Sequence, residues 1–397
     1  MCNQLEYPIQ TIVNPLKKLL KDFDVRESEG RKEYLGFPFM DYKELNRIIS
    51  GIRESHLTLL ATSSSNLRSQ FMLQIAISII CNNKIPVLYV CFEESPDRLL
   101  KQTLSQQTGL PMNTIEHNKI KSNPELKDLL KKGLEKFAKF QSYLSLIAGS
   151  QSDTVEQLEI HLNAMKERYK TEKVILMVDS LQRIPSYNYC PSENARILDI
   201  ANRLKLIANS QRVAVFAGSE ITEQGQEIDA TDNKDRITWK HCYGSADLCR
   251  FADILMTVSK SWIDNTELQM LLRKKAEIAG INDPEIPALM VLDLFIDKLP
   301  KSFGMKDCVQ FLASLENGML TELGCFDEQV LIRQNRIDKL VSGLIDKKII
   351  EFLPKDIANG SGVSVSINNG LATSSETGPT QDQLEKKKIK PTIRLKR

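Results

Sequence analysis

Short runs of apolar residues recur along most of the chain, separated by longer mixed segments. The runs are continuous rather than alternating, which is typical of strands that are buried on both faces of a sheet. We therefore expect strands at residues 57–62, 87–91, 144–149, 174–179, 213–218, 254–258 and 289–296.

Segments with helical spacing lie between several of these runs. Residues 69–80 are apolar nearly all round, as expected of a helix packed inside a layered domain. Residues 153–169 and 193–208 each carry one apolar face. Strands that alternate with helices predict an α/β fold class with a mainly parallel sheet flanked by helices.

The pattern divides the chain into four parts. Residues 1–34 are polar and form an N-terminal extension, and the regular alternation occupies residues 35–320. Residues 321–354 have helical spacing and predict a small helical appendage. Residues 355–397 begin with a stretch rich in Gly, Ser, Asn and Thr and end in a cluster of Lys and Arg. They predict a disordered basic tail, which either contacts nucleic acid or is a solubilising end without a partner.

Composition narrows the class of protein. The chain of 397 residues is 42% hydrophobic and 26% charged, which is typical of a globular protein, and its net charge is only +2. The eight cysteines form no C-x-x-C pair, so neither a zinc ribbon nor a thioredoxin-type site is indicated. No secretory signal is visible, and the longest apolar run, 71–81, is too short to cross a bilayer. We expect a cytoplasmic protein with reduced thiols and no membrane partner.

The segment 59–80 has the layout of a strand, a tight loop and a buried helix, as in phosphate-binding P-loops. A working P-loop uses glycines to wrap phosphates, a Lys to reach them, and a Ser or Thr to hold magnesium. Here the loop contains Ser65 among serines and ends in Leu67, Arg68 and Ser69, so only the Ser69 hydroxyl fits its role. A plain connection between strand and helix is the alternative interpretation.

Two acidic residues follow predicted strands. Asp179 closes the run 174–179, and Glu93 follows the run 87–91. Open α/β sheets bind ligands at the carboxyl ends of their strands, where Asp179 is suited to orient magnesium and Glu93 to activate water. Alternatively, the segment around Ser95 simply caps the next helix, and the two roles are compatible.

Several segments, in this order, resemble the RecA-like ATPase core and are similar to the DnaB-type replicative helicase motor domain and its KaiC and RadA relatives. The resemblance covers about residues 35–320. Its segments are "LGFPFMDYKELNRIISGIRESHLTLLA", "VLYVCFEES", "VDSLQRI", "ANRLKLIANSQRVAVFAGSE" and "YGSADLCRFADILMTV".

The resemblance implies a site for ATP and Mg²⁺ in an oligomer, either a ring or a filament of identical or different subunits. It assigns catalysis to Glu93 and Asp179 and magnesium binding to Ser69 and Asp179. It assigns nucleotide contacts to Ser65, Arg68, Ser69, Glu220 and Lys298.

Four departures from the family pattern affect phosphate handling. Leu67 replaces a glycine, Arg68 replaces the lysine, and Glu220 replaces a glutamine. The family's Lys-x-Arg pair becomes Lys298 followed by Leu299 and Pro300. Because a planar guanidinium does not substitute for a compact ammonium, these departures predict that hydrolysis is lost or weak.

The resemblance also places nucleic-acid contacts in the loops at 180–192 and 222–249. The candidate basic residues there are Arg183, Lys234, Arg236, Lys240 and Arg250. The same loops contain several acids, so solvated loop charge is the alternative.

Three functions are consistent with the sequence. The first is an assembly or regulatory component of a DNA-related system that keeps the ATPase fold without effective hydrolysis. The second is an active ATP-dependent translocase, helicase or repair ATPase. The third is a nucleic-acid-binding module that uses no nucleotide.

Overall fold

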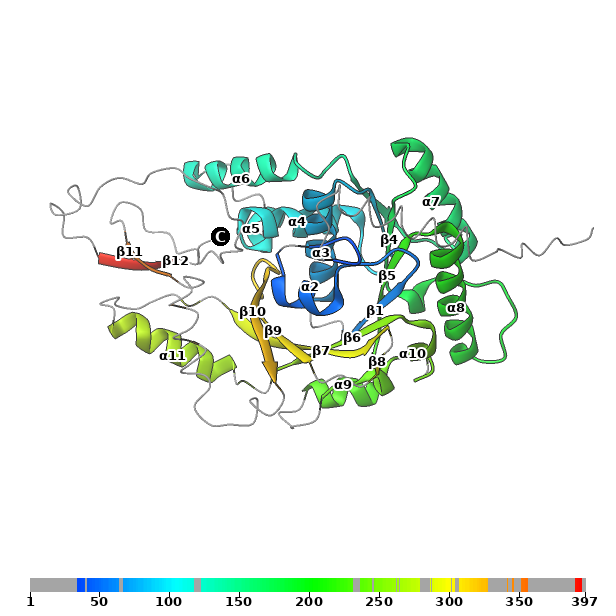
Figure 1. Ribbon diagram of the computed structural model, residues 1–397. Coiled ribbons are helices and arrows are strands. Elements are labelled where there is room, and N and C mark those ends of the chain that lie inside the picture. The colour runs from blue at the N-terminus through cyan, green and yellow to red at the C-terminus, as the bar shows by residue number, and fades with distance from the viewer. Residues whose placement is uncertain are drawn as a thin grey trace, which may run out of the picture.

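The structure is a computed structural model in which one large sheet is flanked by helices (Figure 1). It describes residues 34–39, 41–63, 67–117, 123–230, 236–244, 246–261, 263, 265–278, 286, 288–300, 302–303, 307–327, 341, 345, 351–355 and 390–394.

The large sheet combines a parallel half with an antiparallel half. The parallel strands are β1 (Leu57–Thr62), β2 (Val87–Cys91), β3 (Leu144–Ala148), β4 (Ile175–Asp179), β5 (Ala214–Ser219) and β6 (Ile254–Lys260). The antiparallel strands are β7 (Leu289–Leu299), β8 (Ser302–Phe303), β9 (Asp307–Ser314) and β10 (Leu320–Asp327). The order across the sheet is β10-β9-β7-β6-β1-β5-β4-β2-β3, and β8 pairs with β7.

The parallel half confirms the predicted α/β class and the strands expected from the apolar runs. Strands β1, β2, β4 and β5 are buried along their whole length, which explains why their sequences are continuously apolar. Strand β1 lies between β5 and β6 and is parallel to both. The hairpin of β9 and β10 was not predicted, and it extends the sheet beyond β7.

Helices cover both faces of the sheet (Figure 1). Residues of α3 and α4 pack into a core with one set of strand side chains, and residues of α7 and α8 pack into a second core with the opposite set. The helices are α2 (Lys43–Ile49), α3 (Arg68–Asn83), α4 (Pro96–Thr108), α5 (Met112–Glu116), α6 (Pro124–Phe137), α7 (Val155–Tyr169), α8 (Glu193–Gln211), α9 (Glu223–Ala230), α10 (Leu248–Phe251) and α11 (Asn265–Ile278), with the 3₁₀ turns η2 (Leu181–Arg183) and η3 (Trp239–His241).

The start of α4 confirms the predicted cap. The Ser95 side chain accepts a hydrogen bond from the backbone N–H of Arg98, and Pro96 is the first helical residue. Both features stabilise a helix N-terminus, because they satisfy or remove backbone donors that have no partner within the helix. Because Ser95 makes this cap, the helix N-terminus does not need the Glu93 side chain.

The described residues of the C-terminal part include one pair of strands, while the helical appendage and the disordered basic tail stay predictions. Strand β11 (Glu351–Lys355) forms where helical spacing was expected to continue, and it pairs with β12 (Lys390–Arg394) inside the segment expected to be disordered. The backbone register of this pair matches Phe352 with Ile393. The N-terminal extension 1–33 and most of 328–350 and 356–389 lie outside the described residues.

The described helices also bear on the membrane prediction. None of those in the described part of the chain is both long and apolar enough to cross a membrane.

Candidate functional site

The candidate site lies where β1, β2 and β4 end at the same edge of the sheet. The register of β2 and β4 pairs Cys91 with Asp179, so the two strands end at the same level. Helix α3 begins next to them and carries Arg68 and Ser69 in its first turn. The structure thus brings Glu93, Asp179 and Ser69 together, as the sequence predicted.

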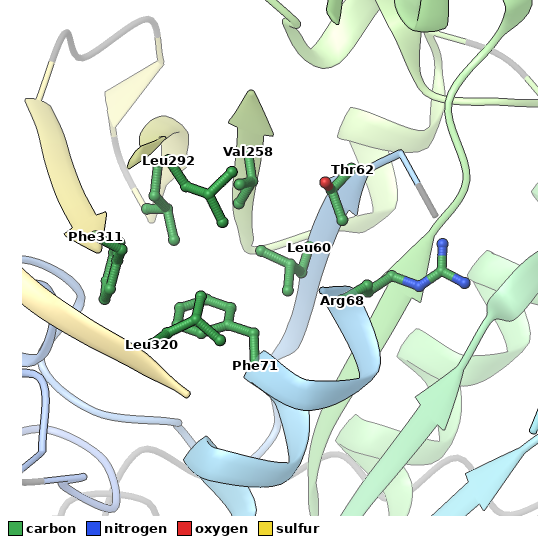
Figure 2. Close-up of a pocket in the computed structure, with 9 residues that line it drawn as sticks. Leu60, Thr62, Arg68, Phe71, Val258, Leu292, Phe311 and Leu320 are labelled. Atoms are coloured by element: carbon green, nitrogen blue, oxygen red, sulfur yellow. The ribbon is translucent and has the colours of Figure 1, made fainter. Parts of the chain in front are cut away.

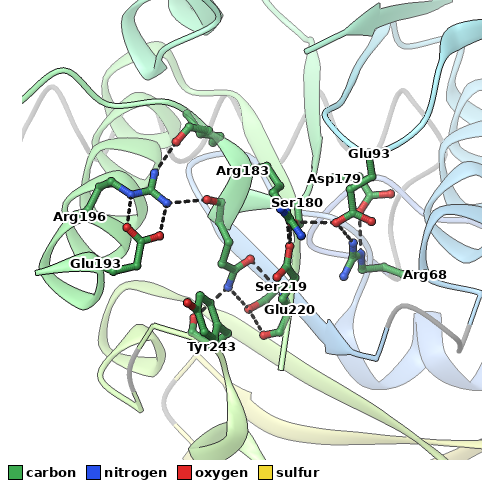
Figure 3. A network of polar contacts seen from close by, with 12 residues as sticks. Arg68, Glu93, Asp179, Ser180, Arg183, Glu193, Arg196, Ser219, Glu220 and Tyr243 are labelled. Carbon is green, nitrogen blue, oxygen red and sulfur yellow. Dashed lines mark hydrogen bonds and ion pairs between the residues drawn. The ribbon is translucent and has the colours of Figure 1, made fainter. Parts of the chain in front are cut away.

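The guanidinium of Arg68 lies between the two carboxylates (Figure 3). Its Nε donates to Oδ1 of Asp179 and its Nη2 to Oε1 of Glu93, both at 2.6 Å. The Arg68 and Asp179 side chains are 2% and 0% exposed, and Glu93 is 26% exposed. The P-loop position that normally meets phosphate therefore carries a cation that is already paired inside the protein.

The second oxygen of Asp179 is also engaged. Oδ2 accepts a hydrogen bond from Oγ of Ser69 at 2.5 Å and another from the Tyr89 hydroxyl at 3.2 Å. Burial, together with the negative charge of Asp179, raises the pKa of Tyr89 well above its ordinary value, so the hydroxyl remains a donor. Both carboxylate oxygens of Asp179 therefore have donors of the protein as partners.

The charge state of Arg68 results from two opposing effects. Burial by itself lowers the pKa of the guanidinium, but the charges of Asp179 and Glu93 and their hydrogen bonds outweigh burial and raise the pKa above its ordinary value. The site therefore holds a permanent positive charge. Burial likewise raises the pKa of the neighbouring Cys91 thiol to about 11, so this thiol stays protonated at neutral pH.

Gly218 in β5 makes room for the guanidinium. A Cβ atom at this position would lie 2.9 Å from Cδ of Arg68 and 3.1 Å from Oδ1 of Asp179. A larger residue would therefore overlap the Arg68 side chain, and one of the two would have to shift. The sequence held one indication of this role, because a glycine inside a strand often marks a close approach by another group.

Leu67 takes the left-handed conformation with φ 56° at the start of α3. Glycine adopts this conformation without steric cost, whereas other residues do so rarely. The loop backbone at Leu67 thus keeps a geometry suited to the glycine of a P-loop, although the side chain differs.

Glu220 continues the polar network away from Arg68 (Figure 3). Its Oε1 accepts from Nε of Arg183 at 2.7 Å and from Oγ of Ser180 at 3.2 Å. The Ser180 hydroxyl also lies 3.4 Å from Oε1 of Glu93, so it connects the two acidic groups. The charge of Glu220, which the sequence placed at the phosphate position, is therefore offset by Arg183.

Sequence reasoning did not find Gln182, which holds this edge of the site in place. Its Nε2 donates to Oγ of Ser219 and to the carbonyl of Tyr243, and its Oε1 accepts from the backbone N–H of Glu220. No local signal distinguishes this glutamine from a surface residue.

Lys298 is not part of the Arg68 cluster. Its Nζ donates to the carbonyl oxygens of Cys249 and Ala252, each at 2.6 Å, at the C-terminal end of α10. Within the chain it therefore acts as a positively charged cap for that helix end. Its predicted nucleotide contact remains a prediction.

Three of the predicted nucleic-acid contacts are paired with acids. Arg183 binds Glu220, Arg236 binds Asp297 at 2.9 Å, and Arg250 binds Asp247 at 3.1 Å. Arg236 also stacks over the Phe295 ring, and Lys240 lies over the ring of Trp239. Lys234 and Ser65 lie outside the described residues. The paired arginines have less charge to offer a phosphate backbone than the sequence implied.

A small cavity of about 10 Å³ lies behind the start of α3 (Figure 2). This is about the room that one water molecule needs. Its lining consists of apolar side chains, Thr62 and the hydrocarbon stem of Arg68. The guanidinium of Arg68 points away from the cavity. The cavity is a packing defect and too small for a nucleotide.

The residues at the site do not fit a magnesium ion in the place that the family resemblance implies. Both oxygens of Asp179 are hydrogen-bonded, and the Arg68 guanidinium lies between the two carboxylates that a metal would need. Across the described ranges, no group of three or more His, Cys, Asp or Glu side chains is placed to hold a metal.

A parallel sheet with a strand–loop–helix, a strand-end aspartate and a glutamate on the next strand defines a RecA-like ATPase fold. The chain belongs to the DnaB-like helicase C terminal domain family, which matches residues 39–279. The predicted family resemblance is thereby confirmed.

Individual relatives are distant. The chain is 22% identical over 188 residues to the replicative DNA helicase DnaB of Buchnera aphidicola subsp. Baizongia pistaciae, a match that spans 45% of this chain and only 38% of the helicase. The fold resembles that of a solved ATPase domain with a TM-score of 0.62 at 17% identity, covering 79% of this chain and 99% of that domain. It also resembles a DnaB-like replicative helicase, studied with its interactions with primase, with a TM-score of 0.60 at 17% identity, covering 79% and 67%.

Proposed function

We propose that the chain is a DnaB-like ATPase-fold protein that does not hydrolyse ATP effectively and serves as an assembly or regulatory component of a DNA-related system. The observation that carries this proposal is the Arg68 guanidinium, which is buried between Asp179 and Glu93. Both groups that would orient magnesium and activate water are held by the protein's own cation.

Electrostatics supports the loss of hydrolysis. A working site needs a metal ion between Asp179 and the phosphates, and a free Glu93 to polarise water. Here each carboxylate has an ion-pair partner at 2.6 Å, and freeing either one leaves the buried guanidinium with one partner fewer. Breaking a buried pair in this way costs about 3–5 kcal/mol, which nucleotide binding would have to supply.

Family membership supports the rest of the proposal. Among the similar proteins, one helicase is described with its interactions with primase. We propose that this chain likewise acts beside other proteins and nucleic acid, in a ring or filament of identical or different subunits. ATP binding without turnover is compatible with this role.

An active ATP-dependent translocase is the second candidate. It is favoured by the convergence of Glu93, Asp179 and Ser69 at one edge of the sheet, in the arrangement that a P-loop enzyme uses. A nucleic-acid-binding module without nucleotide receives less support, because Arg183, Arg236 and Arg250 are paired with acids.

Steady-state ATP turnover by the purified chain with Mg²⁺ tests the proposal. We expect turnover near background in wild type and no further loss in the Asp179→Asn variant. Turnover of about 1 per second or faster that Asp179→Asn abolishes would establish the active enzyme instead.

Nucleotide affinity gives a second test. Restoring Leu67→Gly, Arg68→Lys and Glu220→Gln together should raise ATP affinity more than the sum of the three single changes, because the three positions share one ligand. The single variants are the matched controls. Additive or absent gains would show that these positions do not limit binding.

A further inference from the structure

We propose that His241 is a pH-sensitive latch, which holds the segment 236–243 closed while its imidazole is neutral and releases the segment when the imidazole is protonated. The observation that carries this inference is the capping box at η3. The latch makes no use of the Arg68 cluster and does not depend on whether the chain hydrolyses ATP.

The capping box gives the imidazole the role of an acceptor. The backbone N–H of Thr238 donates to Nδ1 of His241 at 3.0 Å, and the Thr238 side chain accepts from the backbone N–H of His241. In other capping boxes a glutamate or glutamine side chain makes the first of these contacts. Because a backbone N–H can only donate, the contact requires a lone pair on Nδ1 and hence a neutral ring with its proton on Nε2.

Protonation of His241 removes this acceptor. Both ring nitrogens of an imidazolium are donors, so a proton on Nδ1 would face the N–H of Thr238. The Thr238 hydroxyl, 3.3 Å from Nδ1, can accept the new proton. The Thr238 N–H nevertheless loses its partner, and the capping box keeps only one of its two contacts.

The surroundings of His241 disfavour the charged ring. Burial, the largest effect, lowers the pKa of His241 below its ordinary value of 6.5, and the positive charges of Lys240 and Arg236 lower it further. The negative charge of Asp297 in β7 acts in the opposite direction but does not outweigh them. The closed segment therefore binds the proton less tightly than an exposed histidine does.

Helix α9 packs against His241 through a residue without charge. A Cβ added at Gly225 would lie 3.0 Å from Cβ of His241. Of the acids in α9, Glu223 and Glu227 are exposed, and the buried Asp229 accepts a hydrogen bond from a hydroxyl in the loop after β1. Gly225 offers a protonated ring no counter-charge at this contact.

The latch fixes the segment to the edge of the candidate site. The carbonyl of His241 accepts from the N–H of Thr222 at 2.8 Å, and the N–H of Tyr243 donates to the carbonyl of Glu220 at 2.8 Å. The segment carries two of the predicted nucleic-acid contacts, which are Arg236 and Lys240. Opening of the latch would change the position of both.

The lowered pKa determines the direction of the switch. In the open segment we expect His241 to titrate near its ordinary value of 6.5, which lies above its pKa in the closed segment. As pH falls below 6.5, the open form is therefore protonated first. The ratio of open to closed form rises by up to about tenfold per pH unit until the closed form is protonated as well.

The fluorescence of Trp239 in the full-length chain tests the latch. Trp239 packs against the core of the sheet, and Trp262→Phe makes it the sole tryptophan. In this background we expect acrylamide quenching to increase as pH falls below 6.5. His241→Gln keeps an acceptor that does not titrate, so its quenching should stay low from about pH 8 to about pH 5. His241→Ala has no acceptor, so its quenching should be high throughout.

Amide hydrogen exchange gives an independent measurement. At any one pH the intrinsic exchange rates of the segment are nearly equal in wild type and His241→Gln, so their ratio reports the latch. We expect the ratio of wild-type to His241→Gln exchange rates across 236–243 to grow about threefold or more between about pH 7.5 and about pH 5.5. His161→Gln, which removes a histidine paired with Asp153 at 3.1 Å, is the matched control and should behave as wild type.

Three results would overturn the inference. Quenching that increases with acid equally in His241→Gln would assign the change to another group. Wild type whose quenching and exchange stay constant over this range would show that protonation does not open the segment. Folded His241→Ala that is as protected as wild type at about pH 7.5 would show that the Thr238 contact does not hold it. If His241→Ala does not fold, the comparison of wild type with His241→Gln still decides.

Discussion

At the scale of single residues, the shape of the arginine side chain matters as much as its charge. A guanidinium donates in a fixed plane from several nitrogens, whereas an ammonium is a compact point charge. Arg68 uses two of its nitrogens to reach Asp179 and Glu93 at once. The substitution of lysine by arginine thus changes a group that would meet phosphate into one that joins two carboxylates.

The Arg68→Lys variant should therefore be less stable than wild type, although its charge is conserved. An ammonium cannot keep both contacts in the same plane, and losing one charged hydrogen bond costs about 1.5–3 kcal/mol. Chemical denaturation measures this loss. Arg183→Lys is the matched control: Arg183 is 58% exposed in its pair with Glu220, so this change should stay within about 1 kcal/mol. Equal effects of the two variants would contradict the account of Arg68.

The sequence predicted that Arg68, Asp179 and Glu93 would meet, because strand ends and P-loops have recognisable local patterns. It did not predict that they would bind one another. That outcome depends on Tyr89 and Gly218, which come from other strands. A glycine inside a strand indicates a close approach by some group, but no local pattern identifies Arg68 as that group. Residue identities thus predicted which groups converge, while tertiary packing decided their partners.

At the scale of elements, β5 determines whether the arginine fits. The Gly218→Ala variant should lose about 1–3 kcal/mol of unfolding free energy, because the added methyl group would overlap the Arg68 side chain. The loss should largely disappear in the Arg68→Ala background, where that side chain is absent. A double-mutant cycle measures the coupling, and a Gly218→Ala cost that is equal in both backgrounds would contradict it.

Strand β10 holds the start of α2 through a carboxylate. Glu322 accepts hydrogen bonds from the backbone N–H groups of Glu44 at 2.8 Å and Leu45 at 2.9 Å. Burial, the largest effect, raises the pKa of Glu322 above its ordinary value of 4.5 despite these hydrogen bonds. The folded protein therefore holds this proton more tightly than the unfolded chain does.

This raised pKa predicts the sign of a pH effect. As pH rises from about 4.5 towards the raised value, the unfolded chain loses the Glu322 proton first, so the free energy of unfolding falls. Above the raised value, the loss is complete and constant. Glu322→Gln cannot ionise, so its stability relative to wild type should improve between pH 4 and pH 7. A relative stability that is constant or declines over this range would show that Glu322 does not titrate in this way.

The strands of the parallel half were more predictable from the sequence than the antiparallel strands that follow β7. The buried strands of the parallel half were visible as apolar runs, because both of their faces are covered. Strands β9, β10, β11 and β12 were not predicted, because antiparallel pairing with a neighbour stabilises sequences of mixed polarity. Strand β11 pairs with a segment that is distant in the sequence, and local spacing does not indicate such a partner.

At the scale of the whole molecule, charge is distributed more evenly than the loop sequences imply. The net charge is +2, and Arg183, Arg236 and Arg250 are paired with acids. Unpaired positive charge for a phosphate backbone must then come largely from elsewhere. The C-terminal basic cluster is the strongest candidate in the sequence.

Replacing Lys386, Lys387 and Lys388 by Gln should weaken nucleic-acid binding without removing β12. If each lysine contacts one phosphate, the slope of log affinity against log salt should decrease by about 0.9 per lysine for duplex DNA. Replacing three lysines of α6 by Gln is the control for the change in net charge. These are Lys127, Lys131 and Lys132. Identical binding by tail variant and wild type between about 50 and 200 mM salt would make the tail a solubilising end.

The central claim is that Asp179 is the partner of a buried internal cation and not an open metal ligand. The unfolding free energies of wild type and Asp179→Asn, measured by chemical denaturation without metal or nucleotide, test it most directly. Because the change leaves Arg68 buried with one partner fewer, we predict a loss of about 3–5 kcal/mol. Asp247→Asn, in the exposed pair with Arg250, should change stability by about 1 kcal/mol or less. Unchanged or increased stability of Asp179→Asn, as like charges facing each other across an empty metal site would give, would contradict the claim.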